Sequence, residues 1–260
     1  MKPDLLKTYD LRVGYKHQGK ETTLLQDLNL TLRQGTLTAL VGRNGAGKST
    51  LLKALTGTEP PLSGRILLND KDINDYSIRQ KAALIGLVST ERVQAGALTV
   101  TELVALGRQP HTGMLGRLSQ HDHDIVSQAI EQVGITGKAN QYIASLSDGE
   151  RQKAMTAKAL AQQTPIIVLD EPTAFLDTAS RIETIRLLSQ LAHDQGKAVL
   201  LSCHDMAHVI LTADNMWVIT AENQLIDDTP KALIERGDFN KMFTSQGLHF
   251  DTTLLDFTFK

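Results

Sequence analysis

The feature that most constrains the fold is a glycine-rich run, Gly42-Arg43-Asn44-Gly45-Ala46-Gly47-Lys48-Ser49. It matches G-x-x-x-x-G-K-[ST] at every fixed position and lies between the apolar segments 37–41 and 51–55. In such a run the backbone N–H groups converge on phosphate oxygens, and the next helix adds its positive amino end. The sequence therefore predicts a strand, a phosphate-binding loop and a helix in that order. The Lys-Ser ending disfavours the alternative, an ordinary glycine-rich turn.

The loop residues have distinct predicted roles in holding ATP and Mg²⁺. Lys48 is expected to reach the β- and γ-phosphates, and the hydroxyl of Ser49 is expected to bind the metal. The predicted nucleotide contacts in this region are Gly42, Arg43, Asn44, Gly45, Ala46, Gly47, Lys48, Ser49 and Thr50.

Two further apolar runs end at polar residues. The run 166–169 stops at Asp170-Glu171-Pro172, and the run 198–202 stops at Cys203-His204-Asp205. Continuous apolar strands indicate burial on both faces, as in a parallel sheet covered by helices. Ligands of such sheets bind at the carboxyl edge of the strands. We therefore expect these polar residues to meet the phosphate loop at that edge.

The two acids after the first of these runs suit the chemistry of ATP hydrolysis. Asp170 is placed to hold the hydration shell of Mg²⁺. Glu171 is placed to polarise a water molecule as a general base. The alternative, that both acids only cap a helix, loses weight because the chain also carries a phosphate loop.

The pattern along the 260 residues predicts the α/β class, with a P-loop NTPase core, a mainly parallel sheet, an N-terminal antiparallel β subdomain and an inserted helical subdomain. The antiparallel part is predicted from the alternation of Leu11, Val13, Leu25, Leu28 and Leu30. Segments 101–107 and 124–133 and a helix from 151 to 163 make the middle helical. We expect one domain over 1–260, with the core at about 1–85 and 166–260 and the insertion at about 86–165.

Composition narrows the function classes. The net charge of −2 offers no electrostatic reason to expect a nucleic-acid partner. The single cysteine, Cys203, excludes an internal disulfide and a cysteine metal cluster. The start lacks the apolar stretch of a signal peptide, and no apolar run approaches the ~20 residues that span a bilayer. We expect a soluble chain that reaches a membrane only through a partner. The run His121-Asp122-His123-Asp124 is interpreted as a solvated helix start rather than a metal site.

Further motifs narrow the nucleotide-binding class. Leu146-Ser147-Asp148-Gly149-Glu150-Arg151-Gln152 resembles the signature sequence of ABC ATPases, usually Leu-Ser-Gly-Gly-Gln. Phe175-Leu176-Asp177 resembles the D-loop of that family, and His204 resembles its switch histidine. Tyr15 lies where the family places an aromatic that stacks on adenine. The resemblance covers roughly residues 5–240.

This resemblance implies a homodimer in which two ATP molecules are sandwiched between the chains. Ser147 and Gly149 are then expected to contact the ATP held by the partner's phosphate loop. Ser147 and Glu150 have the spacing of a capping box, which would open the helix that follows. His204 is expected to contact the γ-phosphate and orient the attacking water, beside Glu171.

Two departures from the family pattern stand out. The family usually has a glutamine after the strand near 84–88, where it binds magnesium; Thr90 is the best equivalent here, and Glu91 is the alternative. Asp148 and Glu150 replace the more usual glycine and glutamine. Two carboxylates would repel a γ-phosphate, so we expect capping geometry to turn Glu150 back onto its helix.

The segment 98–113 resembles Val-x-Glu-x-Val-x-x-Gly-Arg-x-Pro-His, found in the ATPases of iron–siderophore, haem and cobalamin importers. That resemblance implies integral-membrane permease subunits, indirectly a substrate-binding protein, and a peripheral location on the cytoplasmic face of the inner (cell) membrane. The alternative is that segment 98–113 is only a plain amphipathic helix that ends at Gly107 and Pro110. The main rival function is a soluble ABC-type ATPase that acts as a mechanical clamp in repair, translation or cluster assembly. A scaffold without turnover is disfavoured by Glu171 and His204.

Overall fold

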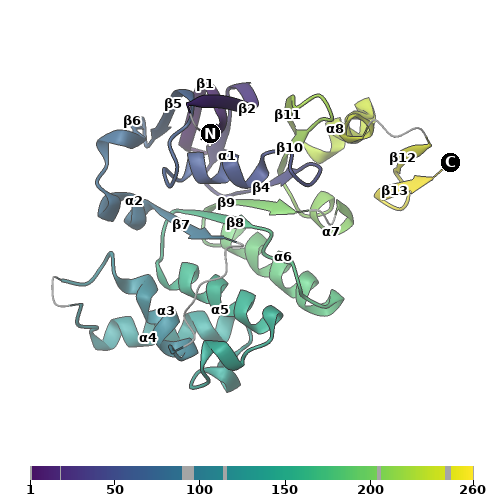
Figure 1. Ribbon diagram of the computed structural model, residues 1–260. Helices are drawn as coiled ribbons and strands as arrows, with labels where there is room; N and C mark the ends of the chain where they lie inside the picture. The colour runs from purple at the N-terminus through teal and green to yellow at the C-terminus, as the bar shows by residue number, and fades with distance from the viewer. Residues whose placement is uncertain are drawn as a thin grey trace.

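A computed structural model describes residues 2–17, 19–89, 97–113, 116–203, 206–243 and 247–259. A sheet with six strands lies at the centre of the molecule (Figure 1), in the order β11-β10-β4-β9-β8-β7. Its strands are β4 (Thr36–Val41), β7 (Ile85–Val88), β8 (Ile166–Asp170), β9 (Ala198–Cys203), β10 (Asn215–Ile219) and β11 (Leu225–Asp228). All neighbours pair in parallel except β10 and β11.

The three strands that were expected to end at the site are immediate neighbours in this sheet. β4 pairs with β9 and β9 pairs with β8, both in parallel. Their carboxyl ends therefore lie along one edge, as the apolar runs predicted. The mainly parallel α/β core is confirmed.

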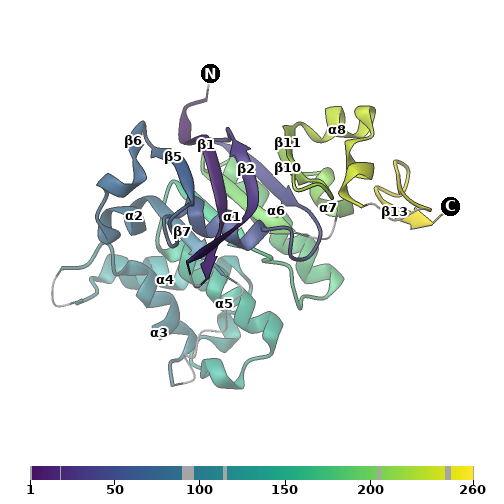
Figure 2. The same ribbon diagram turned by 45° about the horizontal axis from the view of Figure 1, so that its top comes forward.

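A second sheet packs over α1 (Lys48–Leu55) and is antiparallel throughout. It consists of β1 (Asp4–His17), β2 (Lys20–Leu28), β3 (Thr31–Arg33), β5 (Ser63–Leu68) and β6 (Lys71–Asp72). Figure 2 shows its strands in front of α1. Leu51, Leu52 and Leu55 are buried between the two sheets. The predicted N-terminal antiparallel subdomain is confirmed.

The other face of the central sheet is covered by helices, which extend away from it at the bottom of Figure 1. They include α3 (Val100–Ala105), η2 (Leu106–Arg108), α4 (Gln120–Gln132), η3 (Thr136–Lys138), η4 (Ile143–Ser145), α5 (Asp148–Ala161) and α6 (Thr178–His193). The helix α2 (Ile78–Leu84) leads into the edge strand β7, and its Leu84 packs on the α1 side of the sheet. Capping boxes begin α3, α4 and α5, at Thr99, Ser119 and Ser147. The expected bounds of an insertion at 86–165 stay a prediction.

Two helix bounds differ from those expected. α4 begins at Gln120 rather than near 124, because the Ser119 side chain accepts a hydrogen bond from the Asp122 backbone. α5 begins at Asp148 and ends at Ala161, two residues before the expected end. The helix ends early because Gln163 has a positive φ of 53°, which helical backbone does not adopt.

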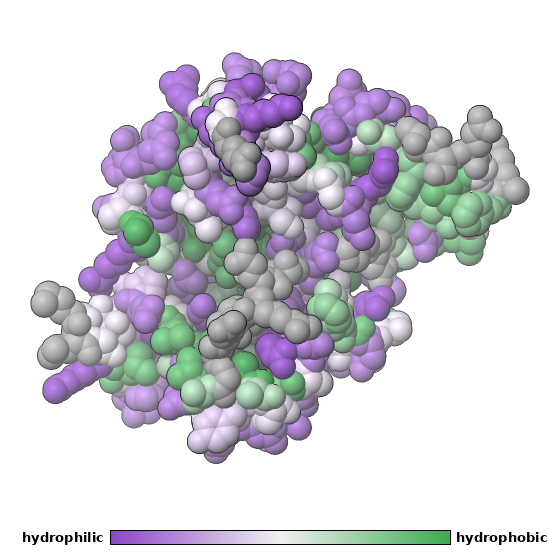
Figure 3. Space-filling view, in the orientation of Figure 1, coloured by the Kyte–Doolittle hydropathy of each residue, from purple (hydrophilic) through white to green (hydrophobic). Residues whose placement is uncertain are grey.

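The last part of the chain forms a small module at the far end of the sheet. It contains α7 (Met206–Ile210), α8 (Pro230–Arg236), η5 (Asp238–Met242), β12 (Leu248–Asp251) and β13 (Asp256–Phe259). The short helix η1 (Ile73–Asp75) lies elsewhere, between β6 and α2. Ring contacts join Phe239 to Phe250, and Phe257 to both Phe243 and Phe250. Apolar residues gather over this module in Figure 3. Across the described parts of the chain, no helix has both the length and the apolar character to cross a membrane.

Candidate nucleotide-binding site

The predicted phosphate loop connects β4 to α1, and neighbouring side chains restrict two of its glycines, Gly42 and Gly47. A side-chain carbon on Gly42 would lie 2.9 Å from Ile219 Cβ, which is too close for any real contact. Gly47 has a left-handed backbone with φ of 99°, and a side chain there would press against Leu24. The strand, loop and helix predicted from the motif are therefore confirmed, and tertiary neighbours on both sides hold the loop.

Lys48 is buried at the start of α1, with 5% of its surface exposed. Its Nζ donates hydrogen bonds to the carbonyl oxygens of Gly42 at 2.9 Å and Arg43 at 3.2 Å. Burial lowers the pKa of Lys48, and the nearby carboxylates of Glu171 and Asp170 oppose that shift. Because the side chain of Lys48 folds back onto its own loop, its ammonium group lies where it would contact an anion bound there.

The loop borders a hollow of about 390 Å³. Glu171, far along the chain, lines the same hollow, as the position of both groups at the sheet edge predicted. The lining is Leu24, Asn44, Gly45, Gly47, Lys48, Ser49, Thr50 and Glu171. Leu24 is a site residue that sequence reasoning missed, because it reads only as one position of β2. Tyr15 lies on β1 opposite Thr22 with 53% of its surface exposed, and its stacking role stays a prediction.

Asp170 and Glu171 are held by a hydroxyl from the neighbouring strand. Ser202 Oγ donates to Asp170 Oδ1 at 2.6 Å, and the backbone N–H of Glu171 donates to Ser202 Oγ at 2.9 Å. Glu171 has a left-handed backbone with φ of 49°, and no helix begins until Thr178. The alternative that the two acids cap a helix is therefore wrong. Sequence reasoning assigned Ser202 to its strand and missed this contact.

The signature-like segment forms the expected capping box. Glu150 Oε2 accepts from the backbone N of Ser147 at 2.9 Å and from its Oγ at 3.0 Å. Lys138 Nζ lies 3.2 Å from Glu150 Oε1, and Arg151 Nη1 lies 2.6 Å from Asp148 Oδ1. The bonds from Ser147 hold the pKa of Glu150 below its usual value, with Lys138 adding to the shift. Both added carboxylates thus have a cationic partner, and the expectation that Glu150 turns back onto its helix is confirmed.

The signature segment lines a second hollow, of about 610 Å³, together with the D-loop-like segment 175–177. A side-chain carbon on Gly149 would lie 3.2 Å from Leu176 Cδ2 and from the carbonyl oxygen of Phe175, so any side chain there would be crowded by the D-loop-like segment. Among the described residues, none lines both this hollow and the one at the phosphate loop. Within one chain, the signature and the loop are separate surfaces.

Three residues with predicted roles lie outside the described residues. They are His204, which follows β9, and Thr90 with its alternative Glu91, which follow β7. Their roles stay predictions.

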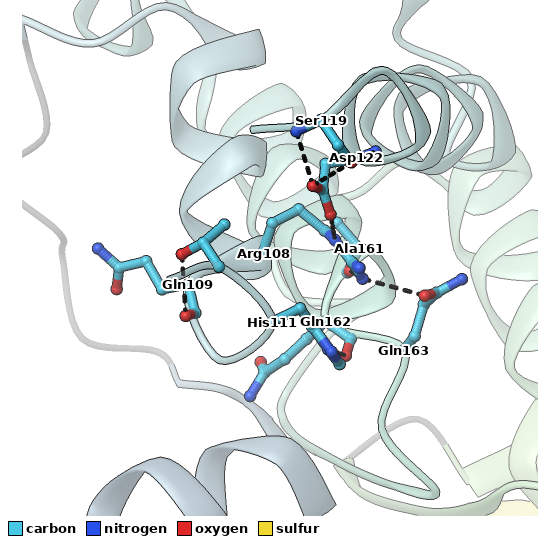
Figure 4. A network of polar contacts seen from close by, with 9 residues as sticks. Arg108, Gln109, His111, Ser119, Asp122, Ala161, Gln162 and Gln163 are labelled. Atoms are coloured by element: carbon cyan, nitrogen blue, oxygen red, sulfur yellow. Dashed lines mark hydrogen bonds and ion pairs between the residues drawn. The ribbon is translucent and has the colours of Figure 1, made fainter. Parts of the chain in front are cut away.

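The Gly-Arg pair of segment 98–113 packs against the end of α5 (Figure 4). A side-chain carbon on Gly107 would lie 2.3 Å from the carbonyl oxygen of Lys158, so only glycine permits this approach. Arg108, with 4% of its surface exposed, donates to Ala161 O at 2.8 Å and to Gln163 Oε1 at 3.0 Å. These contacts give Gly107 and Arg108 a packing role within the chain, which the amphipathic-helix alternative also allows.

The interpretation of 121–124 as a solvated helix start needs a correction. Asp122 is buried, with 8% of its surface exposed, because its carboxylate faces inward. It accepts from Arg108 Nε at 2.8 Å and from Ser119 Oγ at 2.6 Å (Figure 4). Hydrogen bonds from Ser119, and then that from Arg108, hold the pKa of Asp122 far below its usual value.

Comparisons with known proteins agree with this geometry. The family described as "ABC transporter" matches residues 25–174. An uncharacterised ABC transporter ATP-binding protein of Methanocaldococcus jannaschii is 34% identical over 98% of this chain and 87% of its own length. The ferric enterobactin transport ATP-binding protein FepC of Escherichia coli is 35% identical over 88% of this chain and 83% of its own. The iron(3+)-hydroxamate import ATP-binding protein FhuC of Bacillus subtilis is 37% identical, with coverage of 78% and 74%.

Solved structures show the same fold. The cbiO1 protein of Clostridium perfringens, part of an ABC transporter complex, has a TM-score of 0.73 and 30% identity, covering 90% of this chain and 92% of its own. A dimeric bacterial ABC transporter cassette has a TM-score of 0.79 at 23% identity, covering 87% of this chain and 99% of its own. The second likeness bears on the fold alone.

Proposed function

This chain belongs to the ABC transporter family and is an ATP-binding ATPase, and we propose that it drives uptake of an iron chelate, haem or cobalamin through a separate membrane permease. The observation that carries the proposal is the 35% identity, over 88% of this chain, to a relative named for ferric enterobactin transport. Relatives named for ferric enterobactin, iron-hydroxamate and cobalamin transport support it, and they favour transport over a soluble clamp.

Each residue that lines the first hollow has a proposed task. The backbone of the phosphate loop and the amino end of α1 bind phosphate oxygens. Lys48 exchanges its bonds to Gly42 and Arg43 for bonds to the β- and γ-phosphates. Tyr15 stacks on the adenine from β1. Leu24 covers the loop at Gly47 and gives the nucleotide an apolar neighbour.

The residues present fit a magnesium ion. Mg²⁺ takes oxygen ligands and usually keeps waters and substrate phosphates beside one or two protein groups. Ser49 offers a hydroxyl at the hollow, and Asp170 offers a carboxylate whose orientation Ser202 fixes. When bound, the ion would supply positive charge that stabilises the charge developing on the transferred phosphoryl group. Thr90 is proposed as a further metal contact.

Glu171 is the proposed general base. It lines the same hollow as Lys48 and Ser49, so its carboxylate can accept a proton from a water that attacks the γ-phosphate. His204 is proposed to contact the same phosphate and to orient that water.

We propose that the active form is a head-to-tail homodimer. The two separate hollows support this arrangement, because each would supply one half of a shared site. Ser147 and Gly149 then contact the γ-phosphate of the partner's ATP with the amino end of α5. The dimer would sit peripherally on the cytoplasmic face of the cell membrane, bound to the permease, which receives cargo from a substrate-binding protein.

Reconstitution tests this function. The chain is co-expressed with candidate permease and binding-protein partners, and the complex that forms is placed in proteoliposomes. We expect ATP-dependent uptake of one labelled cargo among a ferric siderophore, haem and cobalamin, and no uptake with Glu171→Gln. A complex that hydrolyses ATP but moves none of the three would overturn the cargo assignment. Failure to co-purify with any integral-membrane protein would overturn the transport role itself.

A further inference from the structure

We infer that Ser202 is a positioning residue for ATP hydrolysis, because one buried hydroxyl sets both the carboxylate of Asp170 and the backbone of Glu171. The inference rests on the proposed metal and base roles of these two acids. It assigns to β9 a task in the reaction that neither the phosphate loop nor the signature segment performs.

The direction of each hydrogen bond follows from simple chemistry. The Glu171 N–H can only donate, so Ser202 Oγ accepts from it over 2.9 Å. A hydroxyl has one proton, and the short distance of 2.6 Å to Asp170 Oδ1 places that proton on the line to the carboxylate. Bonds of this length are typical of a hydroxyl donating to an ionised carboxylate. The hydroxyl therefore has one orientation that satisfies both acids.

The sheet makes this arrangement rigid. Asp170 and Ser202 are direct partners in the parallel pairing of β8 with β9. Ser202 is fully buried and Asp170 is 5% exposed, so bulk water competes poorly for either bond. The next peptide leaves the strand with Glu171 in a left-handed conformation, at φ of 49°. Such a conformation in a non-glycine residue persists where its surroundings hold it, and Ser202 supplies one such contact through the amide.

The consequence concerns both groups at once. If the hydroxyl is removed, Asp170 loses a charge-assisted bond and Glu171 loses an amide partner. We expect a weaker hold on the metal and a less defined position of the base. A residue that only stabilised the fold would lower stability and leave the metal dependence unchanged.

The first experiment compares Ser202→Ala with Thr164→Val. Thr164 is an equally buried hydroxyl whose bond, 2.7 Å to Ile166 O, lies at the opposite end of β8. Isothermal titration measures ATP affinity with and without Mg²⁺, and the EPR signal of added Mn²⁺ measures metal binding to the ATP-loaded protein. For Ser202→Ala we expect Mn²⁺ affinity and kcat each to fall about tenfold, as for loss of a bond to a charged group, with metal-free ATP affinity within about twofold. Thr164→Val should match wild type in all three.

A second pair of variants separates the hydroxyl from its volume. Ser202→Thr and Ser202→Val have nearly the same shape, and only the first keeps a hydroxyl. We expect Ser202→Thr to bind Mn²⁺ several-fold more tightly than Ser202→Val. Equal Mn²⁺ affinities in this pair, or a wild-type Mn²⁺ affinity in Ser202→Ala, would overturn the inference.

Asp170→Asn distinguishes failure of the inference from failure of the proposed function. If Asp170→Asn loses metal binding while Ser202→Ala behaves as wild type, only the role of Ser202 is wrong. If Asp170→Asn itself keeps full metal binding and turnover, the proposed site is wrong and the inference falls with it. If Asp170→Asn and Ser202→Ala each weaken Mn²⁺ binding, the double variant should bind Mn²⁺ no more weakly than Asp170→Asn alone.

Discussion

Arg108 and Asp122 form a buried ion pair, with 2.8 Å between Arg108 Nε and Asp122 Oδ1. The pair joins η2, which follows α3, to the first turn of α4, and the same guanidinium donates to the carbonyl of Ala161 at the end of α5. One side chain thereby connects η2 and α4 to α5, the helix that the signature segment begins. Its partners satisfy most of its donors, which is what permits a guanidinium to be buried.

Asp122→Asn should destabilise the fold without changing the nucleotide site. Removing one member of a buried pair leaves the other charge unpaired, and we expect a loss of about 3 kcal/mol in the free energy of unfolding. Denaturant unfolding measures it. Asp124→Asn is the matched control, since Asp124 is exposed on the same helix and should change stability by under about 0.5 kcal/mol. Equal losses in the two variants would contradict the burial argument.

The Asp122 carboxylate should make the free energy of unfolding depend on pH. The pKa of Asp122 lies below its usual value of 3.8, so the unfolded chain takes up this proton first as the pH falls. Its contribution to stability is therefore complete above about pH 4 and is lost progressively below it. We expect the stability difference between wild type and Asp122→Asn to stay constant from neutral pH to about pH 4 and to shrink in more acid solution. A difference that instead grew on acidification would contradict the sign.

Lys48→Ala should leave the protein folded and weaken ATP binding. Burial already disfavours the charged form of Lys48, so its removal costs the fold little. The lost contact to phosphate is charge-assisted, and we expect the Kd for ATP to rise about tenfold or more. Fluorescent ATP binding measures this. Lys53→Ala is the control, because Lys53 lies half-buried on the same helix and pairs with Glu59 beyond the end of that helix; this variant should keep wild-type affinity.

Glu171→Gln should abolish turnover while keeping ATP bound. General-base catalysis contributes about 10²- to 10⁴-fold, and kcat should fall within that range. The amide preserves the shape at the hollow, so ATP affinity should change little and the ATP-bound dimer should accumulate. Size-exclusion chromatography with ATP detects that dimer. Unchanged magnesium-dependent turnover would remove Glu171 from the mechanism.

Glu150→Gln should leave ATPase activity within a few-fold. Gln, like Glu, closes a capping box, so the bonds to Ser147 can persist. The salt bridge with Lys138 is exposed and worth little. Glu150→Ala, which opens the box, should instead lower stability by about 1 kcal/mol. A complete loss of turnover in Glu150→Gln would assign that carboxylate a direct role.

The sequence by itself determined the elements whose information is local. The phosphate loop, its flanking strand and helix, and the capping box at Ser147 all depend on residues within a few positions of one another. Continuous apolar runs predicted β8 and β9 and the polar residues at their ends, because burial on both faces demands such runs. From these features, Lys48, Asp170 and Glu171 are predicted to lie at one edge of the sheet.

Only the tertiary structure decided which distant residues meet. Ser202 contacts Asp170 because β8 and β9 are neighbours in a specific register, and a serine ending an apolar strand has no local pattern that reveals its partner. The polar neighbours of Asp122 in the sequence predicted a solvated side chain. In the fold, η2 packs against α5, and the Asp122 carboxylate faces inward to Arg108 of η2. Motif spacing follows from short-range backbone geometry, whereas these contacts follow from strand order and helix packing, which the whole chain sets together.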